Sequence, residues 1–344
     1  MQGEGKPAPE SVAVKWMERG EAAQIPATKP SGTFRGQVES PCGNDLSLAE
    51  AGATHELRGC TADKFWFSNC GAVMDSVIEA VDARHGRFFV LRNDLFISRS
   101  MIEYGEWTES EFTLMAQLLR PGDTVIDVGA NIGCLTVPFA RTVGPQGCVY
   151  GFEPQPGLYR LLAANTVING LHNVRLFNAA CSDRPDVVAF DEADYTAAAN
   201  YGALSVEALT RQVSRFSRQT LIVTLDAAIQ HEQVRLIKID VEGAEAAVLR
   251  GARELIRRTR PALYVELEFP HLAPETLEQI FELNYEAYWH IPSLFEEHNF
   301  CNNKNNVFEG ICCVNALCLP QEAKAPVQGL RRVASVNDYP VARK

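Results

Sequence analysis

From Thr124 onwards the sequence alternates short β-branched runs with helical runs, and this alternation restricts the fold more than any other feature of the chain. The expected strands are residues 124–128, 148–153, 174–180, 235–241 and 262–268. The helices expected between them lie near residues 135–139, 158–168 and 248–256. A repeated strand-then-helix order predicts an α/β fold, a parallel sheet covered by helices on both faces.

The 344 residues are expected to divide into four segments. These are a loosely ordered extension at 1–56, a small subregion with short strands at 57–110, the α/β domain at 111–320, and a mildly basic, solvated tail at 321–344. The second segment owes its expected strands to apolar runs at 77–81 and 87–97. Two final strands, at 285–291 and 310–320, complete the domain. The long polar stretch 183–220 is either a lid or a surface excursion.

Charge and composition restrict the partners. The formal charge is -11, with 43 acidic against 32 basic residues, which argues against a nucleic-acid binder and favours small molecules or neutral polymers such as glycans. No apolar run reaches the length of a membrane span, so we expect a cytoplasmic location. The ten cysteines include no C-x-x-C pair and predict no metal site of their own.

The strongest chemical signal is the sequence TVIDVGANIG at 124–133, a strand that ends in an acid and is followed by glycines. Glycine lets the backbone turn sharply and approach a ligand at the end of a strand. A dinucleotide site would need G-x-G-x-x-G, and this turn does not have that spacing. We therefore predict a different nucleotide-like cofactor, bound by residues Asp127, Gly129, Ala130, Asn131 and Gly133.

Glu153 follows Gly133 by twenty residues and ends the second predicted strand. A carboxylate there accepts hydrogen bonds from two ribose hydroxyls, and Pro154 follows it. The alternative is that Glu153 caps the next helix. Residues at the end of the third strand are predicted to meet an adenine edge, although Asn and Asp also form ordinary turns: Asn178, Ala179 and Asp183.

The segment KIDVEG at 238–243 carries the candidate catalytic residues. Lys238, Asp240 and Glu242 alternate at the end of the fourth strand, and a period of two places them on one face. The alternative is a buried ion pair that serves stability alone. Glu266 and Glu268 end the fifth strand on the same rim. With Asp240 they are suited either to a divalent cation or to orienting an acceptor, and we predict no metal ligand.

Two other groups of side chains near the end of the domain are candidates for the active site. His271 and His290 are alternative bases, and each alone is more often a surface or half-buried residue. Tyr288 and Trp289 are suited to stacking on a sugar ring, although core packing is the commoner role of such residues.

Four ordered motifs resemble those of the FkbM-type methyltransferases, over about Phe89 to Pro320. They are D-x-G-A-N-x-G at 127–133, F-E-P at 152–154, N-x-A at 178–180 and K-x-D-x-E-G at 238–243. The resemblance implies a class I methyltransferase fold, which is Rossmann-like with seven mostly parallel strands and an antiparallel last strand. It also implies S-adenosyl-L-methionine as cofactor. Similar proteins mostly methylate hydroxyls of sugars or polyketide-type products, and some modify peptide side chains.

The expected activity is therefore O-methylation of a hydroxyl on a sugar, a glycan or a secondary metabolite. An alcohol attacks poorly until its proton leaves, so Lys238, Asp240, Glu242 and Glu266 are the candidates for handling that proton. Two alternatives remain open: N-methylation of a peptide side chain, and a module that binds a nucleoside without catalysis.

Overall fold

The computed structural model describes residues 13–14, 77–190, 192–203, 217–230 and 232–340. Most of the expected extension at 1–56 therefore lies outside the described residues, as do residues 57–76 of the next segment. Residues 204–216, in the middle of the polar stretch expected to be a lid or a surface excursion, also lie outside them.

An eight-stranded sheet forms the centre of the described fold. Its order is β15 (Arg331–Arg332), β12 (Tyr285–His290), β13 (Asn315–Pro320), β11 (Ala262–Glu266), β10 (Val234–Ile239), β4 (Thr124–Val128), β5 (Cys148–Phe152) and β6 (Val174–Phe177). The five strands from β11 to β6 run parallel, and β13 is antiparallel to both β11 and β12. This confirms the expected α/β fold with an antiparallel last strand, to which the short β15 adds an edge.

The strands form because alternate residues are buried on opposite faces of the sheet. In β4, Ile126 and Val128 belong to one core cluster and Val125 belongs to another. In β10, Ile237 and Ile239 likewise face the first cluster, and Leu236 faces the second. Burial of each such side chain contributes about 1.5–3 kcal/mol. Both faces of the sheet therefore carry a core, as the near-continuous apolar strands require.

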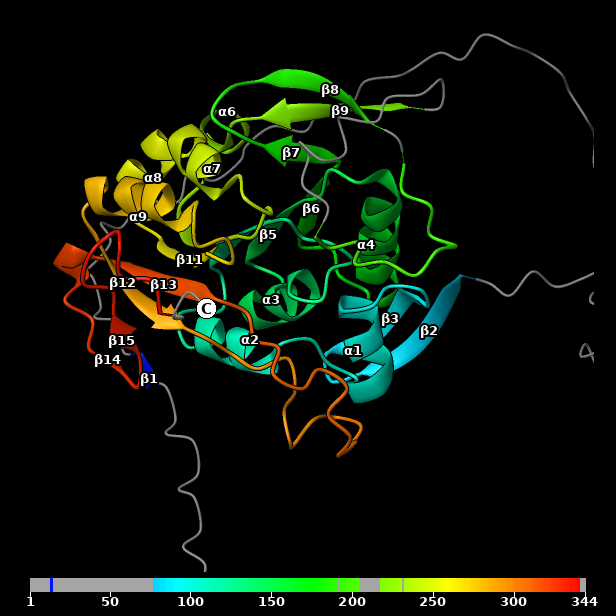
Figure 1. Cartoon of the computed structure of the whole chain (residues 1–344). Coiled ribbons are helices and arrows are strands. Elements are labelled where there is room, and N and C mark those ends of the chain that lie inside the picture. Colours follow the sequence, from blue (N-terminus) through cyan, green and yellow to red (C-terminus); the bar gives the residue numbers. More distant parts are fainter. Residues whose placement is uncertain (1–12, 15–76, 191, 204–216, 231, 341–344) are drawn as a thin grey trace, which may run out of the picture. The chain divides into compact units, whose positions relative to one another are not determined.

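Helices cover both faces of this sheet (Figure 1). One face is covered by α6 (Leu225–Ala228), α7 (Glu245–Gly251), α8 (Arg253–Thr259) and α9 (Ala273–Glu282). The other is covered by α2 (Glu109–Ala116) and α3 (Thr136–Val143). The long helix α4 (Pro156–Ile168) begins with proline at its first position, where no backbone hydrogen bond is lost. None of the described helices combines the length and the apolar composition needed to cross a membrane.

Three smaller sheets surround the centre. A hairpin of β2 (Ile78–Ala83) and β3 (Gly86–Leu91) packs on α4, where Asn165 exchanges hydrogen bonds with the backbone of Phe89. A second sheet has the order β7 (Ala179–Cys181), β9 (Arg218–Val223) and β8 (Asp186–Phe190). The third pairs β1 (Ala13–Val14) with β14 (Val327–Gln328).

The apolar run expected as one strand at 87–97 changes structure after Leu91, where β3 ends. The carboxylate of Asp94 accepts hydrogen bonds from the backbone N–H groups of Phe96 and Ser98. These bonds start α1 (Ile97–Tyr104) in place of further strand. The prediction of strand beyond Leu91 was wrong because a short apolar run does not distinguish strand from helix.

The C-terminal segment 321–340 is mostly exposed or half-buried, as expected of a solvated tail, but it contains secondary structure that the sequence did not predict. A short 3-10 helix (Gln321–Ala323) follows β13, and β15 pairs with the edge strand β12. Val333 is buried, and the hydroxyl of Tyr339 donates to the carbonyl oxygens of Leu267 and Glu268. The tail therefore supports the chain just beyond the end of β11.

Candidate active site

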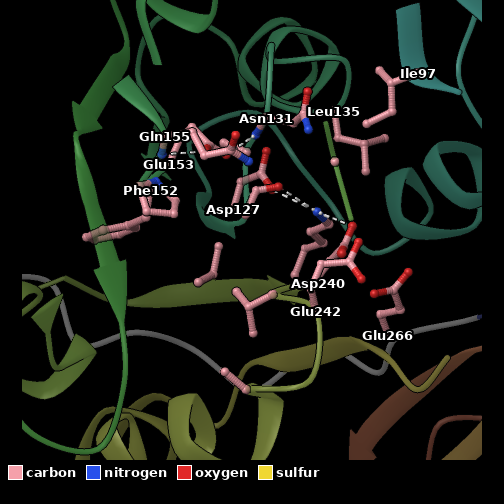
Figure 2. Close-up of a pocket in the computed structure, with 18 of the residues that line it drawn as sticks. Ile97, Asp127, Asn131, Leu135, Phe152, Glu153, Gln155, Asp240, Glu242 and Glu266 are labelled. Atoms are coloured by element: carbon pink, nitrogen blue, oxygen red, sulfur yellow. Dashed lines mark hydrogen bonds and ion pairs between the residues drawn. The ribbon is translucent and has the colours of Figure 1, made fainter. Parts of the chain in front are cut away.

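A cavity of about 310 Å³ lies at the carboxyl ends of β4, β5, β10 and β11. In sheets of this kind ligands bind at the carboxyl ends of the strands, near the point where the strand order reverses. Here that reversal falls between β4 and β10, and Val128 of β4 and Lys238 of β10 both border the cavity. Figure 2 shows Asp127, Asn131 and Glu153 on one side of it and Asp240, Glu242 and Glu266 on the other.

The turn after β4 brings backbone against the cavity. Gly129 has a φ of +80°, and a Cβ there would lie 1.8 Å from the carbonyl oxygen of Asp240. The N–H groups of Gly129 and Ala130 both donate to the carbonyl oxygen of Phe152. Only glycine fits at this position, because a side chain would collide with the neighbouring strand end and strain the backbone.

Glu153 is buried at the end of β5 and is held by the backbone. Its Oε2 accepts from the N–H of Asn131 at 2.9 Å, and its Oε1 accepts from the N–H of Gln155 at 2.8 Å. The second bond ties Glu153 to the residue before α4, but no side chain caps the helix itself, so the alternative of a helix cap is not what the structure shows. An ionised carboxylate has about four acceptor positions, so two remain for a ligand. Burial raises the pKa of Glu153 to about 7, although the two N–H bonds lower it.

Lys238 links the ends of β4 and β10. Its ammonium donates to the carbonyl oxygen of Gly129 at 3.0 Å and pairs with Asp240 at 3.0 Å and Asp127 at 3.6 Å. Burial lowers the pKa of Lys238, but the carboxylates of Asp240 and Asp127 outweigh it and raise that pKa overall. Asp127 is fully buried, and its Oδ2 accepts a hydrogen bond from the hydroxyl of Thr136. The ion pair therefore fixes the glycine turn against the adjacent strand.

Three carboxylates from two strand ends converge at the other side of the cavity. One oxygen each from Asp240, Glu242 and Glu266 lies within 4.8 Å of the other two. Burial and then Asp240 raise the pKa of Glu242 to about 8, and the same two causes raise the pKa of Glu266. Their convergence comes from a turn: β10 ends at Ile239, and Glu242 has a left-handed φ of 56°. The strand was expected to include Lys238, Asp240 and Glu242, but it ends before Asp240, so strand alternation does not place Asp240 and Glu242.

A comparison with known protein families matches residues 127–300, half of the chain, to the family described as "Methyltransferase FkbM domain". The chain belongs to the FkbM methyltransferase family. The matched range begins at the acid of the glycine turn, and it includes Glu153, the turn at 238–243 and Glu266.

Curated relatives match shorter stretches of this chain. The 31-O-demethyl-FK506 methyltransferase FkbM of Streptomyces tacrolimicus is 33% identical over 162 residues, which cover 40% of this chain and 62% of the relative. The 2-O-methyltransferase NoeI of Sinorhizobium fredii is 27% identical over 161 residues, which cover 43% of this chain and 64% of the relative. The matches thus span less than two thirds of either relative.

Among solved structures, methyltransferase FkbM from Methylobacillus flagellatus KT is similar over 62% of this chain and 49% of its own. It is 14% identical in sequence, with a TM-score of 0.39.

Three of the expected cofactor residues lie outside the cavity wall of this FkbM protein. Gly133 gives room to Leu162 of α4, since a Cβ at Gly133 would lie 2.9 Å from that side chain. Asn178 donates to the carbonyl oxygens of Glu153 and Pro154 and so supports the turn after β5. Asp183 pairs with Arg250 at the surface. The third strand also divides in two, and the second part, β7, brings Ala179 to the cavity.

The alternative bases and stacking residues also lie elsewhere. His290 is buried against the hydroxyl of Tyr264, and burial lowers its pKa to about 4. Trp289 packs in the main core beside Tyr339. Neither of them lines the cavity, and neither does His271.

The cavity is also lined by residues that were not singled out from the sequence: Gln155, Ser182, Trp107, Leu294 and Ile311. Leu294 shares a small separate core with Tyr104 and Phe308. These residues lie in loops whose sequences have no periodic pattern, so only the fold brings them together.

Proposed function

We propose that this protein is an S-adenosyl-L-methionine-dependent methyltransferase that transfers the methyl group to a hydroxyl of a sugar, a glycan or a secondary metabolite. One observation carries the proposal: a single cavity has Glu153 on one side and the converging Asp240, Glu242 and Glu266 on the other. The two relatives are named as enzymes that methylate oxygen, which supports oxygen over nitrogen.

The cavity residues fit a nucleoside-containing donor. Glu153 has acceptor positions left for ribose hydroxyls, and Oε1 of Gln155 is buried with no hydrogen-bond partner. The close approach of Gly129 to the carbonyl oxygen of Asp240 holds the turn after β4 against the end of β10, at the edge of the cavity. We therefore assign donor binding to Asp127, Gly129, Ala130, Asn131, Glu153, Pro154 and Ala179, all of which line the cavity.

S-adenosyl-L-methionine supplies a methyl group on a positively charged sulfur. The chain's own residues must hold the acceptor in line and take up its proton. We assign the handling of that proton to the carboxylates of Asp240, Glu242 and Glu266, which converge in the cavity, and Lys238 holds Asp240 in place. Trp107 and Ile311 give the acceptor an apolar wall.

Transfer is tested with the full chain, donor labelled in the methyl group, and acceptor pools that offer either hydroxyls or amines. We expect label in hydroxyl acceptors at least about tenfold faster than in peptides with free amines. Asp240→Asn should slow transfer, and the exposed Glu275→Gln, which removes the same charge elsewhere, should not. Label mainly in amines would favour N-methylation. Donor binding without any S-adenosylhomocysteine formed would favour a non-catalytic module.

Donor affinity is expected to rise about tenfold between pH 6 and pH 8, because ribose hydroxyls donate to the ionised form of Glu153. Burial places the pKa of this group at about 7, so the free protein is mostly protonated at pH 6 and mostly ionised at pH 8. Affinity is thus lost as the pH falls through 7. Calorimetry with a chelator present measures it, and Glu153→Gln should give a flat profile. A flat wild-type profile would contradict the assignment.

A further inference from the structure

We propose that Asp240, Glu242 and Glu266 bind one hard divalent cation, such as Mg²⁺ or Mn²⁺, at the cavity wall across from Glu153 (Figure 2). One oxygen from each residue lies within 4.8 Å of the others. Two oxygens on opposite sides of one such ion, with metal–oxygen distances of about 2.1–2.4 Å, lie about 4.2–4.8 Å apart. The three side chains can therefore contact one ion with no more than small rotations.

The buried oxygen of Glu266 is the second observation that points to a ligand. Glu266 is only 9% exposed, and its Oε2 has no hydrogen-bond partner. Figure 2 shows this carboxylate directed towards those of Asp240 and Glu242. A buried carboxylate oxygen without a partner is costly, and natural proteins pair such groups or coordinate them to metals. A cation at this point satisfies it.

The charges around the cavity leave this cluster unbalanced. Six carboxylates line the cavity, and among the described lining residues Lys238 is the only one with a positive charge. Its ammonium is already engaged by Gly129, Asp240 and Asp127. Within the described ranges no basic nitrogen lies within 4.0 Å of a carboxylate oxygen of Glu242 or Glu266. A divalent ion supplies the missing charge.

The donor set determines the kind of ion. Three carboxylate oxygens are hard ligands, which suit Mg²⁺, Mn²⁺ or Ca²⁺ better than the thiolate- and imidazole-binding metals. Such ions keep several coordination positions for water or substrate oxygens. An acceptor hydroxyl that contacts the ion would lose its proton more readily. This consequence rests on the proposed function, whereas ion binding itself does not.

Binding is tested on metal-stripped full-length protein without donor or acceptor. Mn²⁺ is titrated and followed by electron paramagnetic resonance and by calorimetry, and Mg²⁺ is then added as competitor. We expect one ion per chain, displaced by Mg²⁺, and a loss of affinity of about tenfold or more in Glu266→Gln. The control is Glu268→Gln, because this exposed carboxylate lines the same cavity outside the cluster; it should change affinity less than about threefold.

Thermal unfolding gives a readout that does not need activity. Mn²⁺ should raise the melting temperature of the wild type and leave that of Glu266→Gln unchanged. Removing a buried carboxyl group whose Oε2 has no partner should also make metal-free Glu266→Gln at least as stable as the wild type. If that variant does not fold, Glu242→Gln, at a half-buried position, serves the same comparison.

Three results would overturn the proposal. They are no saturable Mn²⁺ binding below about 1 mM, equal losses in Glu268→Gln and Glu266→Gln, and binding of butylammonium in place of Mn²⁺. The last would identify an amine-binding site. Failure of the ion site and failure of the proposed function are distinguishable. If only the ion site fails, the protein should still bind donor and transfer methyl groups in the presence of chelator.

Discussion

Replacing Glu153 by alanine is expected to weaken binding of S-adenosyl-L-methionine about 100-fold or more. Hydrogen bonds to a charged group contribute about 1.5–3 kcal/mol each, and two ribose hydroxyls would lose theirs together. Every 1.4 kcal/mol corresponds to about a factor of ten in affinity. The measurement is the dissociation constant by calorimetry at pH 8, where Glu153 is ionised.

The same substitution also frees the N–H groups of Asn131 and Gln155, so stability must be measured beside affinity. Glu153→Gln is the matched control, because it keeps the shape and one carbonyl acceptor. It should bind donor more weakly than the wild type and more tightly than Glu153→Ala. Unchanged affinity in a folded Glu153→Ala variant would contradict ribose recognition and leave only the support of the turns at Asn131 and Gln155 as the role of this residue.

Replacing Lys238 by methionine is expected to lower the free energy of unfolding by about 3–5 kcal/mol, because it leaves a buried charge without its partner. Asp127 is fully buried, and Lys238 is the cation next to it. A loss of this size is a large part of the total stability of an ordinary domain. Urea unfolding followed by circular dichroism measures it.

Two further variants separate the ion pair from other effects. Adding Asp127→Asn to Lys238→Met removes the stranded charge and should restore about half of the lost stability or more. Arg257→Met breaks an exposed pair with Glu254 and should cost less than about 1 kcal/mol. If Lys238→Met were as stable as Arg257→Met, the network at the end of β10 would have no structural role.

The sequence predicted the central sheet well because its strands are buried on both faces. Such strands need continuous β-branched and apolar residues, and the run at 124–128 coincides with β4. The secondary structure of the C-terminal tail was not predicted, for the opposite reason. β15 has two exposed arginines, and it is held by strand pairing, by Val333 and by the distant contacts of Tyr339, none of which produces a periodic pattern.

The same limit applies to the site. Asp240 and Glu266 end adjacent strands, so their position on one rim could be predicted. That Glu242 turns towards them depends on its left-handed backbone and on Glu245, whose carboxylate accepts from the N–H of Gly243. Asn178 and Asp183 are expected in the site because they flank the end of a strand. In the structure, Asn178 bonds to the backbone of Glu153 and Pro154 and Asp183 pairs with Arg250, and neither of them lines the cavity.

The small core of Tyr104, Leu294 and Phe308 has a consequence for how such an enzyme can diversify. It anchors the segment between β12 and β13 to α1, where the hydroxyl of Tyr104 bonds to the backbone of Asn305 and Val307. The part of the cavity wall at Leu294 and Ile311 is thus held by a core that is separate from the core of the sheet. On the proposed function, we expect substitutions there to change acceptor choice while Glu153 and the turn after β4 keep their places, so that a change of substrate needs no change in the sheet.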